Sequence, residues 1–141
     1  MMDSMMRKTT NFELVREFNK IMDQDVDTKL DRESINLVWF RLKLIKEEFE
    51  EVQDSIFQLN ESFLTNHNVD GAKSNLLKEL ADLLYVVYGA GVSLGLDLDE
   101  AFKRVHESNM SKLVDGKPLK NKDGKVIKGP FYKKPFLQDL V

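Results

Sequence analysis

Apolar residues recur at helical spacing along most of the first 113 residues of the chain. With a period near 3.6 residues, they predict helices at about residues 11–24, 34–59, 73–94 and 98–113. Polar stretches at residues 23–31 and 60–70 separate the first three helices, and Gly95 is a suitable C-terminal cap for the third. The pattern therefore predicts an all-α fold, a bundle of four helices.

The residues that follow the fourth helix predict a short hairpin and an irregular tail. The turn dipeptide Asp123-Gly124 separates two short apolar runs, and Pro130 and Pro135 interrupt the stretch beyond them. At this length we expect one domain, residues 1–141, with a helical core at about 11–113 and a basic C-terminal tail at about 114–141.

The helix predicted at residues 34–59 is apolar over more than one narrow stripe. Its main stripe consists of Ile35, Val38, Leu42, Ile45, Phe49, Val52, Ile56 and Leu59. A small bundle does not bury this much apolar surface alone, so we expect a homodimer or a dimer of dimers. Phe18 and Trp39 are expected in the core, with stacking on a nucleobase as the alternative.

A second stripe on the same helix changes from hydrocarbon to carboxylate along its length. Leu37, Phe40 and Leu44 begin it, and the same line leads on to Glu48 and Glu51. A solvated face is more often polar throughout. The change from apolar to acidic residues therefore indicates that these two carboxylates face a cleft.

A second acidic cluster, Glu79 with Asp82, lies in the next predicted helix. Carboxylates three residues apart project from one face of a helix, so two such pairs on facing helices would place Glu48, Glu51, Glu79 and Asp82 in one cleft. Four like charges are unfavourable there unless protons or cations compensate them. Because hard divalent cations prefer oxygen ligands, the pattern predicts a Mg²⁺ site, with Mn²⁺ as the alternative metal.

Composition narrows the classes of function. The 141 residues contain no cysteine, which excludes disulfides and thiolate metal sites, and 42% hydrophobic with 32% charged residues suit a soluble globular protein. No apolar run approaches the length of a membrane span, and residues 1–8 lack the features of a secretory signal. We therefore expect a cytoplasmic protein without a membrane partner.

Charge is unevenly distributed. Residues 112–134 hold eight lysines against two aspartates, a net charge of +6, so the rest of a chain of net charge −3 carries −9. An acidic body with a basic tail suits a ligand that combines metal and polyanion, although most tail lysines are expected to be solvated. A nucleic-acid partner is not expected, because the pI is near 5.5 and the tail aromatics do not alternate with its lysines.

Both acidic clusters together resemble the all-α nucleoside triphosphate pyrophosphohydrolases, a superfamily with MazG-like proteins, dimeric dUTPases and phosphoribosyl-ATP pyrophosphohydrolases. The resemblance covers about residues 35–113 and extends to the tail of one branch. The motifs that carry it are Arg41-Leu-Lys-Leu-Ile-Lys-Glu47-Glu48-Phe-Glu-Glu51, Lys78-Glu79-Leu-Ala-Asp82, His106-Glu-Ser-Asn109-Met-Ser-Lys112 and Lys128-Gly129-Pro130-Phe-Tyr132.

The resemblance implies Mg²⁺-dependent hydrolysis of a nucleoside triphosphate to the monophosphate and pyrophosphate, in a housecleaning role on the nucleotide pool. It implies that Glu48, Glu51, Glu79 and Asp82 are the metal ligands and that Glu47 orients or deprotonates the attacking water. For substrate binding, the implied residues are Lys112, Lys128, Asn109 and Tyr132.

Two other classes of protein are alternatives. A di-iron or di-manganese bundle uses Glu-x-x-His pairs, but residues 103 and 64, which precede the two histidines by three positions, are lysine and leucine. A non-catalytic nucleotide-sensing or dimerisation module is the second alternative. All five acidic motif positions are filled, which favours the enzyme.

Overall fold

The computed structural model describes residues 8–141 and confirms the all-α prediction. Residues 1–7, which include most of the segment where no secretory signal is predicted, lie outside the described part. In chain order, its principal elements are α2 (Asn11–Ile21), α3 (Ile35–Thr65), α4 (Val69–Leu94), α5 (Leu98–Met110), β1 (Leu119–Lys120) and β2 (Val126–Ile127). Two 3₁₀ turns, η1 (Arg32–Ser34) and η2 (Gln138–Leu140), complete them.

The described chain forms two compact units. The first ends at Leu96 and contains α2, α3 and α4, and the second runs from Asp97 to Val141. Helix α5 belongs to the second unit. Asp97 begins α5 by accepting a hydrogen bond from the backbone N–H of Glu100, as its capping position predicts.

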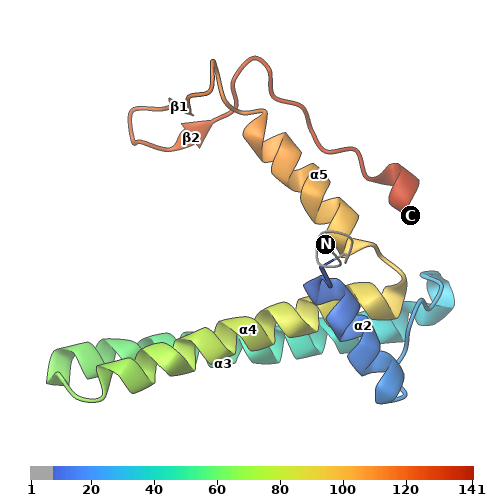
Figure 1. Ribbon diagram of the computed structural model, residues 1–141, viewed down its shortest axis with the longest axis horizontal. Helices are drawn as coiled ribbons and strands as arrows, with labels where there is room; N and C mark the ends of the chain where they lie inside the picture. The colour runs from blue at the N-terminus through green and yellow to red at the C-terminus, as the bar shows by residue number, and fades with distance from the viewer. Residues whose placement is uncertain (1–7) are drawn as a thin grey trace, which may run out of the picture. The chain divides into compact units, whose positions relative to one another are not determined.

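Helices α3 and α4 run side by side in opposite directions and form the long axis of the first unit (Figure 1). The 31 residues of α3 contain no glycine or proline, so nothing interrupts the helix before Thr65. Asn66 and Asn68 then adopt left-handed backbone conformations, both with φ of 50°, which asparagine tolerates well. The loop expected at residues 60–70 is wrong in extent, since only residues 66–68 separate the helices.

The main apolar stripe of α3 divides into two columns. Val38, Ile45, Val52 and Leu59 are buried or half-buried, as expected of the side that packs on a neighbouring helix. Residues of the other column recur every seven positions and are 48–55% exposed: Ile35, Leu42, Phe49, Ile56 and Phe63. The predicted stripe is therefore too wide for one chain to cover.

Helix α2 crosses α4 at one end of the hairpin (Figure 1). Its Phe12 and Val15 are buried, whereas Ile21 and Met22 are 68% and 55% exposed. The helix ends at Ile21, earlier than the predicted residue 24, because Asp23 takes a left-handed conformation. Trp39, expected in the core, is 63% exposed.

The connection from α2 to α3 is tied to the last turn of α4. The backbone N–H groups of Asp27 and Thr28 donate to the carbonyls of Val92 and Ser93, at 2.9 and 2.8 Å. Ser93 donates its hydroxyl to the carbonyl of Asp25, at 3.2 Å. These bonds hold residues 25–28 against α4 and so set the entry into α3.

In the second unit, the predicted hairpin is present and the tail is fastened to α5. Strands β1 and β2 pair antiparallel around a turn in which Gly124 has φ of 78°. Arg104 bonds both carboxylate oxygens of Asp139, at 2.6 and 3.0 Å, which lowers the pKa of that carboxyl. Ser108 donates to the carbonyl of Lys133 at 2.7 Å. Helix α5 ends at Met110, three residues earlier than expected.

Within the described residues, no single helix is both long and apolar enough to cross a membrane. Only α4 and α5 taken together meet the length and composition requirement, and residues 95–97 interrupt that pair.

Gly95 provides a test of how α4 ends. It has φ of 67°, and a β-carbon there would lie 3.5 Å from Cα of Asp27, which is ordinary contact. We expect Gly95→Ala to reduce the free energy of unfolding by about 1 kcal/mol because alanine strains this conformation. Gly95→Asn should lose less in the same urea titration. Equal losses of unfolding free energy in the two variants would indicate that side-chain volume, and not backbone conformation, causes the effect.

Candidate functional site

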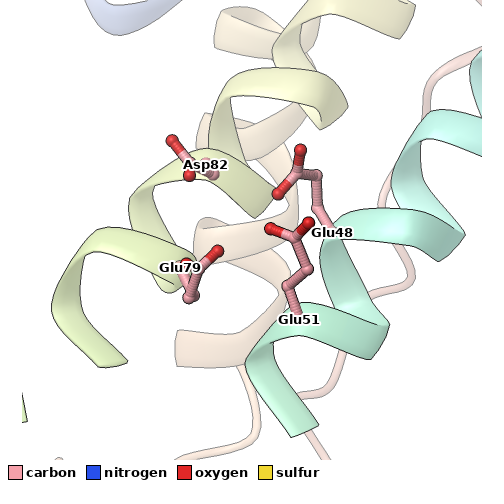
Figure 2. A group of neighbouring side chains, drawn as sticks. All are labelled: Glu48, Glu51, Glu79 and Asp82. Carbon is pink, nitrogen blue, oxygen red and sulfur yellow. The ribbon is translucent and has the colours of Figure 1, made fainter. Parts of the chain in front are cut away.

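Four carboxylates meet where α3 and α4 face each other. Glu48 and Glu51 project from α3, Glu79 and Asp82 project from α4, and the two pairs point toward one another (Figure 2). One oxygen of each lies within 4.8 Å of one oxygen of every other. The structure thus brings together all four residues that the sequence predicts as metal ligands.

Burial makes this group costly without a cation. Glu79 is only 8% exposed, Glu48 and Asp82 are half-buried, and Glu51 is exposed. Oε2 of Glu48 and Oε2 of Glu79 are buried and have no hydrogen-bond partner among the described residues. Buried carboxylate oxygens normally have donors or a cation beside them. The donor set, oxygen only and partly desolvated, therefore fits a hard divalent ion.

A proton can compensate the repulsion between Glu51 and Glu79. Contact with Glu79, together with the negative charges of Glu48 and Glu79, raises the pKa of the Glu51 carboxyl. A carboxylate only accepts hydrogen bonds, so Glu51 and Glu79 can bond only when one of them is protonated. A cation bound at this point would replace that proton.

Lys78 contributes a positive charge on the α4 side. Its Nζ lies 2.8 Å from Oδ2 of Asp82 and 3.3 Å from Oε1 of Glu79, and these carboxylates raise the pKa of the lysine. The sequence reasoning assigned Lys78 no role. Its spacing of four residues from Asp82 is the signal that identifies the pair.

Glu47 and Glu50, the other acidic residues of the first cluster, are exposed and do not belong to the group of four. The role of Glu47 toward water stays a prediction.

The four residues predicted to bind substrate all lie in the second unit. Nζ of Lys128 is 4.7 Å from the ring centroid of Tyr132. Lys112 lies beside the next residue, Gly129, where a β-carbon would come within 2.8 Å of the Lys112 carbonyl oxygen. Asn109 is exposed near the end of α5. Three of the four thus share one neighbourhood, while their role toward substrate stays a prediction.

Comparison with known proteins places most of the chain in one group. The model of the phosphoribosyl-ATP pyrophosphohydrolase family matches residues 15–109, a region that includes all four carboxylates. The uncharacterized protein L479 of Acanthamoeba polyphaga mimivirus is 36% identical over 96 residues, which cover 65% of this chain and 34% of the relative. The chain spans about a third of that relative's length.

Removing one carboxylate charge should stabilise the protein while it weakens metal binding. We expect Glu51→Gln to unfold a few degrees above wild type at pH 7 in EDTA, and to gain less stability from added Mg²⁺. Folding raises the pKa of the Glu51 carboxyl above its ordinary value of 4.5. The protonated side chain therefore stabilises the folded wild-type protein at low pH, and this stabilisation is lost as the pH rises above 4.5. The advantage of the variant over wild type should therefore grow from pH 4.5 to pH 8.

Thermal unfolding with EDTA or with Mg²⁺ measures both effects, and Glu50→Gln is the matched control on the same helix. Equal Mg²⁺ stabilisation of Glu51→Gln and wild type would contradict the assignment of Glu51 as a ligand.

Proposed function

The chain belongs to the phosphoribosyl-ATP pyrophosphohydrolase family, and on that premise we propose that it hydrolyses (deoxy)nucleoside triphosphates to the monophosphate and pyrophosphate with Mg²⁺. The observation that supports the proposal most is the four-carboxylate group with its two unpartnered buried oxygens. A polyphosphate is itself strongly anionic and cannot approach such a group without a cation between them. Removal of unwanted nucleotides is the role that this chemistry suits.

In this proposal Glu48, Glu51, Glu79 and Asp82 hold the metal. Bound Mg²⁺ neutralises phosphate charge and lowers the pKa of water. Glu47 takes the proton of the attacking water as the anhydride bond between the α- and β-phosphates breaks. The exposure of Glu47, on the same turn of α3 as Glu48, leaves its carboxylate accessible to water.

The basic residues of the second unit bind the substrate in the same proposal. Lys112 and Lys128 compensate the phosphate oxygens, including the charge that develops on the leaving pyrophosphate. Asn109 and Tyr132 contact the sugar or the phosphates. The support is the close approach of Gly129 to the backbone carbonyl of Lys112 and the contact of the Lys128 ammonium with the ring of Tyr132.

We further propose that the protein is a homodimer built on the exposed column of α3. Its five apolar residues, defined above, recur every seven positions over 28 residues, about 42 Å of helix. A seven-residue apolar repeat is the pattern of helices that pack lengthwise on one another. A second copy supplies a surface of matching length and character.

Pyrophosphate release from a panel of ribo- and deoxynucleoside triphosphates tests the proposed reaction. We expect release that requires Mg²⁺ and stops with EDTA. Glu47→Gln should lower kcat about 100-fold because it removes the base, while Mg²⁺ still raises the melting temperature of the variant.

Glu50→Gln is the matched control and should stay within twofold of wild type. Orthophosphate as the first product would contradict the reaction. Absence of turnover with intact Mg²⁺ binding would favour a nucleotide-sensing module.

The dimer is tested by reversing the character of its surface. Ile56→Glu places a charge in the middle of the α3 column, and we expect it to shift the mass measured by light scattering from dimer to monomer. Gln58→Glu places the same charge at an exposed position on the other side of α3 and should leave the mass unchanged. A monomeric wild-type protein would refute the proposal.

A further inference from the structure

A cavity opens in the first unit near the carboxylate group. Its volume is about 140 Å³, and α2, α3 and α4 all contribute to its walls, among them Phe18, Arg41, Leu44, Tyr85, Val86 and Gly89. Leu44 precedes Glu48 by one helical turn on α3, and Val86 follows Asp82 by one turn on α4. Each step is about 6 Å along its helix axis. The cavity therefore lies about one helical turn from the carboxylate group on both helices.

Arg41 is the unexplained charge in this cavity. The residue is only 5% exposed, yet its Nε is buried without a hydrogen-bond partner, and the described residues form no ion pair with it. The contact between its Nη2 and Oε1 of Gln24 is long, at 3.3 Å. Burial lowers the pKa of the guanidinium, which Asp25 opposes from a distance. An arginine buried this deeply normally has acceptors on several sides.

The lack of a side chain at Gly89 leaves space beside the guanidinium of Arg41. A β-carbon at Gly89 would lie 3.2 Å from Nη1 of Arg41, tighter than most real contacts. Asn19, only 2% exposed, is held in the wall by donating to the carbonyl of Asp25 at 3.3 Å. Neither residue supplies Arg41 with the acceptor that its Nε lacks.

The size and chemistry of the cavity point to a single ring with acceptor atoms. A cavity of about 150 Å³ is known to admit one benzene ring, so 140 Å³ suits one six-membered ring better than a fused pair. Phe18 and Tyr85 meet edge to face, with centroids 5.4 Å apart, and form an aromatic wall. A guanidinium only donates hydrogen bonds, so the ring must present carbonyl oxygens or unprotonated nitrogens.

We propose that this cavity binds the base of a pyrimidine nucleotide and that Arg41 selects it by donating to a ring carbonyl. The inference rests on the proposed function, because the carboxylates one turn away hold the metal and phosphates of the same molecule. A fused purine ring system needs more room than the volume that suits one six-membered ring. Arg41 is thus a specificity residue, one that touches the base and takes no part in bond cleavage.

Kinetics with base-containing and base-free substrates test this assignment. Wild type should prefer pyrimidine over purine triphosphates at least tenfold in kcat/KM. Arg41→Met should lower kcat/KM for pyrimidine triphosphates 10- to 100-fold, mainly through KM, because a buried charged hydrogen bond is lost. Turnover of deoxyribose 5-triphosphate, which has no base, should change less than twofold. Arg32→Met, at an exposed arginine just before α3, is the matched control.

Gly89→Ala provides a second test in case Arg41→Met does not fold. It keeps the charge of Arg41 but crowds Nη1, so it should also raise KM selectively for pyrimidine triphosphates. An equal loss on the base-free substrate would make Arg41 a structural residue. A purine preference of wild type would refute the pyrimidine assignment.

A direct binding measurement separates this inference from the reaction itself. Calorimetry with uridine and cytidine in EDTA should detect binding to wild type and none to Arg41→Met. If no triphosphate is hydrolysed, the proposed function fails. Nucleoside binding alone then shows whether the cavity accepts a pyrimidine base. Binding of adenosine in place of the pyrimidine nucleosides, or of no nucleoside, would overturn the inference.

Discussion

Repulsion among four carboxylates is the constraint on which the arrangement of the first unit depends. Their oxygens come within 4.8 Å only because α3 and α4 pack along their length and hold Glu79 in a buried position. The helices are stabilised elsewhere, by apolar contacts and by the tie between residues 25–28 and α4. Packing energy from the rest of the hairpin thus maintains a local arrangement that would separate in a free peptide.

Much of the fold and the central group could be predicted from sequence because both depend on short-range periodicity. The spacing of Glu48 from Glu51, and of Glu79 from Asp82, places each pair on one helix face wherever the helix lies. The C-terminal cap at Gly95 likewise acts locally. Their prediction required no knowledge of how the helices pack.

Features that depend on tertiary packing escaped prediction. The predicted helix is shorter than α3 because the polar residues Asn60, Glu61 and Ser62 suggest a loop, whereas the chain reverses only at Asn66 and Asn68. The burial of Arg41 requires three helices to meet, and its sequence neighbours do not show that. Trp39 was expected inside, yet it lies on a face of α3 that one chain leaves exposed. Periodicity identifies apolar faces but does not identify what covers each of them.

The ammonium of Lys78 has a consequence for how the carboxylate group selects its ions. A cation that used Oδ2 of Asp82 would compete with Nζ of Lys78 for that oxygen, so its binding would be an exchange of one positive charge for another. A monovalent ion would gain little in that exchange over the lysine already in place, whereas a divalent ion would gain more from the same carboxylates. A lysine tethered beside the group would thus act as a competitor that favours ions of higher charge.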